Sequence, residues 1–320
     1  MLRSTLRSLA LLPLFLALAH FFGFAFGHLV APIQAAANPL YVTQVSREPL
    51  LERYAAYVSG FARLDFGTLP AQAGATPIIT VLLNAIGASL GLFVIAGVLS
   101  ILAGITLGLL AVRDRPPRVA GWLPSVAALG LATPTFFFAV LGIAFVIMFL
   151  IWAPGRVLLL PLEGYGWDRH LVLPVIALML RPTAQIAQVT ANAMVNELSR
   201  QYVVTARSIG VAERRIVWRH TLRNAVPAIV ATIATALRFS AGELIVIESL
   251  FYWPGIGLLA AQTLIPANNS VVPETALFLN PPLLGGVLLL AAALFLLINL
   301  CADLIVQFVD PRLRSQPVEA

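Results

Sequence analysis

Six long apolar runs constrain this chain more than any other feature of its sequence. A helix needs about 20 apolar residues to cross the hydrocarbon core of a bilayer. The chain has 320 residues, of which 60% are hydrophobic and only 11% are charged, whereas a soluble domain carries about 25% charged residues. The sequence therefore predicts an all-α integral membrane protein with six transmembrane helices, at roughly residues 9–31, 85–112, 122–152, 171–195, 226–250 and 282–308.

Two segments beside these runs have their own expected structure. The second apolar run is too long for one simple crossing, so its first part, Pro77–Leu83, is expected to lie along the membrane interface. The segment Pro32–Thr76 is mixed in character, and Glu48–Phe61 within it is expected to form a short helix. We therefore divide the chain into residues 1–76, the first span with an external segment, and residues 77–320, a five-helix core.

The N-terminal run has two interpretations. Arg3 and Arg7 precede it, and Ala35–Ala37 resembles the small-residue cleavage site of a signal peptide. The apolar core of a signal peptide is only about 7–15 residues long, and this run is longer. A retained first span is therefore favoured over a cleaved signal.

The arginines predict how the spans are oriented. An even number of spans places both termini on one side, and cytoplasmic loops are enriched in basic residues. Thirteen arginines share the side of the termini, whereas five lie on the opposite side and two lie within spans. Both termini and the loop at residues 196–227 are therefore expected in the cytoplasm. The thirteen are Arg3, Arg7, Arg113, Arg115, Arg118, Arg200, Arg207, Arg214, Arg215, Arg219, Arg223, Arg312 and Arg314, and the five are Arg47, Arg53, Arg63, Arg156 and Arg169.

The loop at residues 196–227 is basic, yet its apolar residues keep helical spacing. Tyr202, Ala206 and Ile209 fall on one face of a helix, and Gly210 is expected to end that helix because glycine adopts the left-handed conformation readily. The loop is therefore predicted to be structured rather than a flexible linker.

A second helix is expected to begin at Ala212–Glu213, where the helix dipole favours a carboxylate, and Pro227 is expected to mark the entry into the next span. The small residues Ala206 and Gly210 permit close approach of another protein, and the arginines of the loop can pair with acidic residues there. A helix resting on anionic lipid explains the same pattern. From the residues alone, both interpretations are open.

The chain contains no lysine, since all twenty basic residues are arginine. A phosphate-binding loop of the G-x-x-x-x-G-K-[ST] kind needs its lysine, so the chain is not expected to hydrolyse ATP alone. No catalytic constellation is apparent, and the dispersed histidines do not suggest a metal site. We therefore expect no enzyme activity and no bound cofactor or metal. The net charge of +6 is explained by membrane topology, so no nucleic-acid partner is expected.

Ionisable residues within the spans are expected to be functional, because each costs at least a few kcal/mol in hydrocarbon. Arg181, Arg238, Glu243 and Glu248 are candidates for a translocation path or gate. Arg238 and Glu243 are five residues apart and are not suited to pair along one helix. Glu248 has a second interpretation, as an acceptor for turn amides, and Asp303 is favoured as a hydrogen-bond partner between helices.

Three motifs occur in the order that is found in one transporter family. Tyr202–Gly210 reads YVVTARSIG, Ile247–Gly257 reads IESLFYWPGIG, and Asn299–Arg312 reads NLCADLIVQFVDPR. They resemble the E-A-A-x-x-x-G loop, the V-E-x-x-F-x-x-P-G-x-G segment and the N-L-x-x-D…D-P-R ending of ABC importer permeases of the dipeptide/oligopeptide/nickel branch. The resemblance covers most of the chain.

The resemblance implies a type I ABC importer permease-like bundle in the bacterial cytoplasmic (inner) membrane. It implies as partners a second, similar permease, two ATPase subunits that use ATP and Mg, and an external solute-binding protein. The substrate would be a peptide or a related small solute, with nickel or another chelate as a further option. In this family the loop is a coupling helix that seats on the ATPase subunit, which implies coupling roles for Tyr202, Thr205, Ala206, Arg207, Gly210, Arg219, Leu222, Arg223 and Asn224.

The chain also departs from the family pattern. His220 and Arg223 replace the isoleucine and proline of the I-x-L-P ending of the loop, a departure that is typical of the peptide branch. Residues 268–282 lack the usual R-D-x-P-like segment, and Arg181 is unusual, so the outer mouth and the substrate are less constrained. A gradient-driven secondary transporter is the alternative function, and an intramembrane enzyme would need catalytic residues that the sequence does not display.

Overall fold

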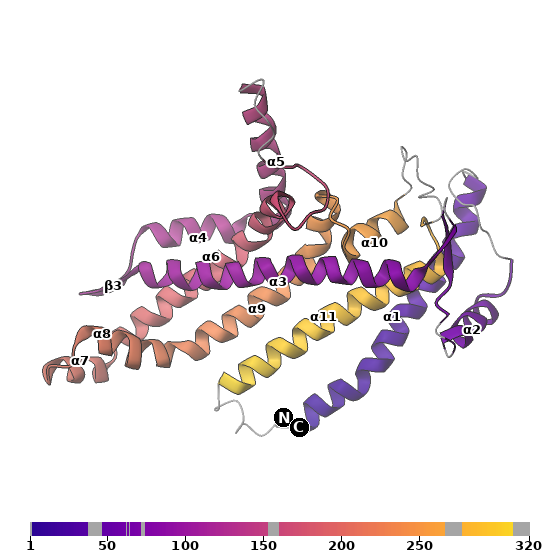
Figure 1. The fold of residues 1–320 in the computed structure, drawn as a ribbon. Helices are drawn as coiled ribbons and strands as arrows, with labels where there is room; N and C mark the ends of the chain where they lie inside the picture. Colours follow the sequence, from indigo (N-terminus) through magenta and orange to yellow (C-terminus); the bar gives the residue numbers. More distant parts are fainter. Residues whose placement is uncertain are drawn as a thin grey trace. The chain divides into compact units, whose positions relative to one another are not determined.

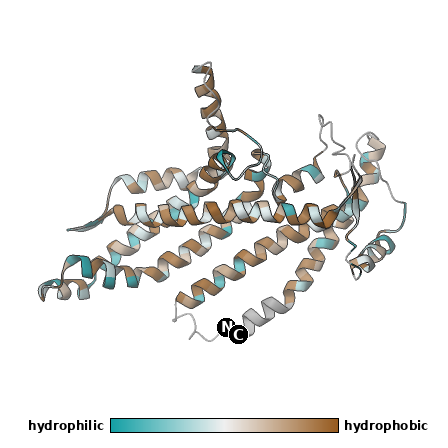
Figure 2. Cartoon of the chain, in the orientation of Figure 1, coloured by the Kyte–Doolittle hydropathy of each residue, from teal (hydrophilic) through white to brown (hydrophobic). Residues whose placement is uncertain are grey.

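The computed structural model describes residues 2–37, 47–61, 63, 65–71, 74–152, 160–265 and 277–309. Within these ranges six helices are long and apolar enough to cross a membrane, which confirms the predicted number of spans. Their apolar surfaces appear as brown ribbons in Figure 2. The six helices, labelled in Figure 1, are α1 (Leu2–Ala37), α3 (Ile78–Leu110), α5 (Thr135–Trp152), α6 (Val172–Leu198), α9 (Leu222–Leu250) and α11 (Pro281–Val309).

The chain forms two compact units that are interleaved along the sequence. The first unit comprises residues 1–91, 163–165 and 248–296, and the second comprises residues 92–162, 166–247 and 297–320. The division predicted after residue 76 falls inside the first unit.

The first unit holds the short helix that the sequence predicted at residues 48–61. This helix, α2, runs from Leu50 to Phe61, within the range expected for it. It packs against α1 through aromatic rings, with Tyr54 and Tyr57 each about 5 Å from Phe24, measured between ring centroids. An antiparallel pair of short strands, β1 (Thr68–Ala71) and β2 (Gly74–Pro77), follows.

The prediction that Pro77–Leu83 lies along the interface is wrong. Strand β2 ends at Pro77, and α3 then continues without a break for 33 residues from Ile78. Ile78 and Leu82 are buried in the first unit, with 1% and 6% of their surface exposed. No proline interrupts the run after Pro77, so nothing forces the chain to turn before it enters the span.

Glycines allow α3 to approach α6 closely in the second unit. A Cβ atom at Gly104 would lie 2.7 Å from Cβ of Ile186, and one at Gly108 would lie 2.6 Å from Cβ of Thr190. Glycine at these two positions therefore permits close packing of the two helices. At Gly87, by contrast, an added Cβ would meet nothing within 4 Å in this chain.

A hairpin and a broken span follow α3. Strands β3 (Val112–Asp114) and β4 (Pro117–Val119) pair antiparallel. The third predicted span, residues 122–152, then forms two helices, α4 (Trp122–Ala132) and α5. The break falls at Thr133, whose backbone is extended with φ −93° and ψ 126°. Its cause is Pro134, because a proline disfavours helical backbone in the residue before it.

The fifth span begins earlier than the sequence suggested. After a short 3-10 turn, η1 (Arg169–Leu171), α6 leads into the loop helices α7 (Gln201–Ser208) and α8 (Glu213–Arg215). A π-helical turn, η2 (Ile216–Thr221), then joins α8 directly to α9. Pro227 therefore lies inside α9 and does not mark its start. A proline inside a helix removes one hydrogen bond and crowds the preceding turn, and packing of the buried Ala225 and Ile229 against Met194 holds the helix on either side.

Candidate functional site

Helix α7 is a short exposed helix that one buried side chain anchors. It begins after Arg200, whose backbone is extended, and Val203 is its only fully buried residue. The helix ends in a Schellman motif: Gly210 N–H donates to the Arg207 carbonyl and Val211 N–H donates to the Ala206 carbonyl, both at 3.0 Å. Gly210 has φ +80°, a conformation that glycine adopts without steric cost. The helix–glycine corner–helix arrangement predicted from the sequence is confirmed.

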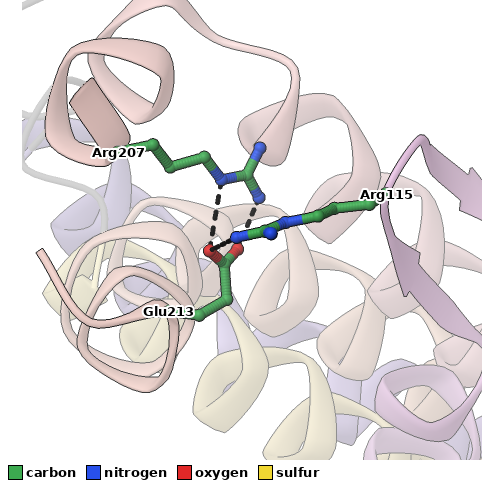
Figure 3. Close-up of polar contacts among 3 residues, drawn as sticks. All are labelled: Arg115, Arg207 and Glu213. Atoms are coloured by element: carbon green, nitrogen blue, oxygen red, sulfur yellow. Dashed lines mark hydrogen bonds and ion pairs between the residues drawn. The ribbon is translucent and has the colours of Figure 1, made fainter. Parts of the chain in front are cut away.

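One carboxylate ties the two loop helices together. Glu213, in the first turn of α8, accepts hydrogen bonds from Arg207 at both oxygens, with Nη2 at 2.5 Å from Oε1 and Nε at 3.2 Å from Oε2. Arg115 of the turn between β3 and β4 donates to Oε2 of the same carboxylate at 2.9 Å. Figure 3 shows the carboxylate held between the two guanidinium groups. A bidentate arginine–carboxylate contact fixes orientation as well as distance.

The outer face of α7 is apolar and small rather than charged. Val204 and Ile209 expose 52% and 74% of their surface, and Thr205 and Gly210 are also exposed, whereas Ala206 is half-buried. Exposed apolar residues beside a bare glycine corner make a face that another protein can approach closely.

Tyr202 lies in the first turn of α7, at the beginning of this face. Its hydroxyl donates to Glu197 Oε2 at 2.9 Å. Partial burial raises the pKa of the Tyr202 phenol above its ordinary value, so the phenol is protonated and remains a donor throughout the neutral pH range.

Basic residues surround the far end of the loop. Arg219, Arg223 and Asn224 are exposed on η2 and α9, whereas Leu222 is half-buried and packs inward beside Met194. A shallow depression of about 570 Å³ is lined by Ala212, Arg214, Arg215 and Trp218. The polar colouring of α7 and α8 in Figure 2 contrasts with the apolar helices that lead to them. Of the nine residues implied in coupling, eight thus lie on or near the exposed surface and Leu222 supports them from below.

Three spans meet at a polar cluster in the second unit. Arg181 on α6 donates through Nη1 to Glu243 Oε1 on α9 at 2.5 Å. Thr135, the first residue of α5, donates to the other oxygen of Glu243 at 2.7 Å. The ring of Phe239 lies 5.9 Å from the Arg181 guanidinium carbon. The Arg181 and Glu243 side chains are 36% and 20% exposed, so the pair is only partly shielded.

The spacing of Arg238 and Glu243 predicted that they would not pair with each other, and they do not. Arg238 instead forms an ion pair with Asp303 on α11, which agrees with the interpretation of Asp303 as a partner between helices. The two charged contacts therefore join α9 to different neighbours.

Glu248 belongs to the first unit, and its surface is fully buried. Its Oε2 accepts from Gly257 N–H at 2.7 Å, at the start of α10 (Ile256–Leu264). Ser89 on α3 accepts from Ile256 N–H at 2.8 Å, and Trp253 Nε1–H donates to the Ala88 carbonyl at 3.0 Å. The geometry favours a turn-amide acceptor for Glu248.

The structure describes only part of what the sequence singled out. Asn268–Val272 and Asp310–Arg312 lie outside the described residues. Within the described ranges no group of three or more His, Cys, Asp or Glu side chains is placed to hold a metal ion.

Comparison with known proteins decides the family. Residues 100–315, which include the loop, the polar cluster and the last three spans, match the family described as the binding-protein-dependent transport system inner membrane component. The chain belongs to this family. It is therefore the membrane-spanning permease component of a binding-protein-dependent ABC importer.

Named relatives of this permease extend over most of its length. It is 30% identical to a protein of Brucella suis that is named as a peptide permease, with 89% of this chain and 86% of the relative covered. It is 27% identical to the oligopeptide transport system permease protein AppB of Bacillus subtilis, over 85% of this chain and 86% of the relative. It is 28% identical to the inner membrane ABC transporter permease protein YejB of Escherichia coli O157:H7, over 83% of this chain and 72% of the relative.

The fold of the permease also has a solved counterpart. A chain of the MetNI methionine ABC transporter, in inward-facing conformations, superposes with a TM-score of 0.55 at 19% identity. The match covers 73% of this chain and 98% of that chain. The predicted type I importer permease fold is thereby confirmed.

Sequence reasoning missed three residues that the structure brings to these sites. Arg115 was counted only as a topology signal, yet it contacts the loop, and Thr135 and Ser89 complete the surroundings of Glu243 and Glu248. The proline after Thr133 was an available signal for a break that places Thr135 at a helix start. No signal in the sequence pairs residue 115 with residue 213, because their contact spans 98 positions.

The Glu248 turn of the permease predicts a strong effect at Gly255. A Cβ atom there would lie 2.2 Å from Oε1 and 2.4 Å from Oε2 of Glu248, and this carboxylate is held by Gly257. We expect Gly255→Ala to cost about 1–3 kcal/mol of stability through overpacking, seen as a lower unfolding temperature of the purified protein. Gly87→Ala is the matched control on α3, where the added Cβ has open space. Equal unfolding temperatures for the two variants would contradict this account of the turn.

Proposed function

We propose that this permease moves peptides into the bacterial cytoplasm and that α7 is its coupling helix. The observation that carries the proposal is the exposed face of α7, ended by the Schellman motif at Gly210, in a chain whose relatives are named as peptide permeases. A helix of this kind, on a polar loop between two spans, is suited to docking in a groove of a partner protein.

The coupling set comprises the exposed residues of the loop and those that hold them. Val204 and Ile209 supply apolar contact, the arginines supply charge to pair with acidic groups, and Gly210 permits close approach. The set named from the sequence is retained in full, and its members are Tyr202, Thr205, Ala206, Arg207, Gly210, Arg219, Leu222, Arg223 and Asn224.

Two separate ATPase subunits would supply the energy, with ATP and Mg bound there and not by this chain. A second, similar permease would complete the membrane part, and an external binding protein would deliver the substrate. Closure of the ATPase pair would pull the coupling helices and favour one of two global states of the spans. Both termini would lie in the cytoplasm, on the side of α7, as the arginine distribution predicts.

The translocation path would pass the polar cluster of Arg181 and Glu243, with Arg238 near it on α9. Charged groups inside a membrane are retained where they face a path or a partner, and the partial exposure of this pair supports a place on the path. Glu248 would contribute to gating only indirectly, by fixing the turn that precedes α10, because its carboxylate is buried. A nickel chelate as substrate has no support in the ligand groups of the described residues.

ATP dependence separates this proposal from a gradient-driven transporter. The complex, purified with its partners and placed in liposomes with its binding protein, is expected to accumulate labelled peptide when ATP is enclosed and without an ion gradient. Uptake under an ion gradient by this chain alone, with no requirement for ATP, would overturn the proposal. A nickel salt with a chelator, tested in the same liposomes, is expected to show no accumulation.

A further inference from the structure

The β3–β4 hairpin, part of the second unit, packs on α6 at its base and carries an exposed turn at its tip. Val112 and Val119, which face each other in its register, pack against a cluster of small buried residues that includes Ala187 and Ala191 of α6. The hairpin is therefore seated on the cytoplasmic part of α6, and its turn extends beyond this contact.

The exposed turn of the hairpin contacts the loop at residues 196–227 through Arg115. Arg115 donates to Glu213 at 2.9 Å, although its side chain is 72% exposed. The Glu213 and Arg207 side chains are only 28% and 24% exposed. Glu213 therefore has a shielded inner partner on α7 and an exposed outer partner on the hairpin (Figure 3).

Chain connectivity gives the outer contact a mechanical meaning. Helix α7 is joined covalently to α6 on one side and, through α8 and η2, to α9 on the other. The hairpin instead connects α3 to α4. A displacement of α7 is thus carried by the chain to α6 and α9, and it reaches α3 and α4 through their packing on α6. The hairpin adds a second route to α3 and α4 that starts at the loop itself.

We propose that the β3–β4 hairpin is a second cytoplasmic element of the coupling machinery, and that Glu213 is the positioning residue that joins its turn to α7. The proposal rests on the proposed function of α7. The inner Arg207–Glu213 contact sets the angle between α7 and α8, and the outer Arg115–Glu213 contact gives the loop a second connection to α3 and α4, beside their packing on α6.

Other arginines of the hairpin show that the contact is selective. Arg113 and Arg118 occupy facing positions in the register and are exposed, and neither forms an ion pair among the described residues. A basic turn that served only as a topology signal would not need to place one of its three arginines on a half-buried carboxylate. The hairpin therefore contributes charge to the cytoplasmic side and a specific contact to the loop.

Single variants test the outer contact. Arg115→Ala is expected to lower ATP-dependent peptide uptake by about threefold, the scale of an exposed ion pair. Arg118→Ala, the matched control, removes the same charge from the same hairpin and is expected to leave uptake unchanged. Both variants are expected to insert in normal amounts. Equal uptake for the two variants would overturn the proposal.

A charge-exchange series tests whether Glu213 acts through position and not merely through folding. Arg207→Glu with Glu213→Arg keeps the inner contact but sets a guanidinium beside Arg115, so uptake is expected to fall by about tenfold. Adding Arg115→Glu restores the outer contact with reversed charge and is expected to raise uptake about threefold above the double exchange. The rest of the loss is expected to remain, because Arg207 also belongs to the coupling set.

The number of peptides transported per ATP hydrolysed distinguishes coupling from folding, because a contact that only stabilised the fold would leave this ratio unchanged. We expect this ratio to fall in the double exchange and to recover in the triple exchange, while the amount of assembled complex stays constant. Failure of the triple exchange to recover, with complex present, would overturn the hairpin proposal. Absence of ATP-dependent uptake in wild type would instead overturn the proposed function itself.

Discussion

Gly210→Asp is expected to lower peptide uptake by at least about tenfold, while the permease still inserts into the membrane. The added Cβ meets nothing within 4 Å in this chain, and aspartate is one of the few residues that tolerate a left-handed backbone such as φ +80°. The fold of the loop should therefore survive. The new carboxylate would lie on the exposed face of α7, and the acidic partner surface that the arginines of the loop are proposed to meet would repel it by several kcal/mol.

Gly210→Asn is the matched control, because it has the same size and backbone preference without the charge. We expect it to keep more uptake than the aspartate variant, and to retain the ATPase subunits during purification. Ala206→Glu places a carboxylate on the half-buried side of the same helix and is expected to abolish uptake as well. Wild-type uptake by either acidic variant, at normal levels in the membrane, would contradict the coupling assignment of α7.

The structure of the loop at residues 196–227 was predictable because its determinants are local. Apolar spacing sets the face of α7, and a single glycine after that spacing both ends the helix and supplies the positive φ. The six spans were predictable for a similar reason, since span length depends on the thickness of the bilayer and not on tertiary contacts.

Two errors arose where a proline was given the wrong weight. Pro227 was expected to start a helix, yet packing of its neighbours carries α9 through it. Pro134 was given no weight within the third apolar run, yet it divides that run into α4 and α5. Both positions lie in apolar sequence, and what differs is the tertiary contact of the flanking residues, which a single sequence does not display.

For the charged residues within the spans, the sequence could exclude a pair but could not name the true partners. Helical spacing argued correctly against a pair between Arg238 and Glu243, but it could not name Asp303 or Arg181 as the partners that the structure gives them. These contacts span more than 60 positions. Arg115 was missed for the same reason, since a charge count assigns it to a side of the membrane but not to a carboxylate.

Glu243→Ala is expected to cause a clear loss of stability. Both carboxylate oxygens of Glu243 are occupied, by Arg181 and by Thr135, and their removal leaves a guanidinium unpaired inside a span. A buried pair broken in this way costs about 3–5 kcal/mol. The partial exposure of both side chains lowers our expectation to about 2 kcal/mol, because water can reach the stranded arginine.

Thermal unfolding of the purified complex in detergent measures this loss. Glu243→Gln keeps an acceptor for Thr135 and is expected to unfold between wild type and Glu243→Ala. Arg181→Met combined with Glu243→Leu removes both charges and fills similar volume, so it is expected to unfold close to wild type, since apolar replacement of an ion pair is often neutral. A double variant less stable than Glu243→Ala would contradict the account of the pair as mutually compensating.

Uptake by the same double variant decides whether the pair belongs to the translocation path. A pair that only ties α6 to α9 would be replaced without loss, because apolar side chains of similar volume keep the helices in contact. A pair that lines the path also offers polar contacts to a passing peptide, and no apolar pair can replace them. We expect the double variant to assemble with its ATPase subunits and to remain stable, yet to lose uptake by about tenfold, the equivalent of about 1.4 kcal/mol. Wild-type uptake in this stable variant would reduce Arg181 and Glu243 to a packing contact and would move the path to another face of the bundle.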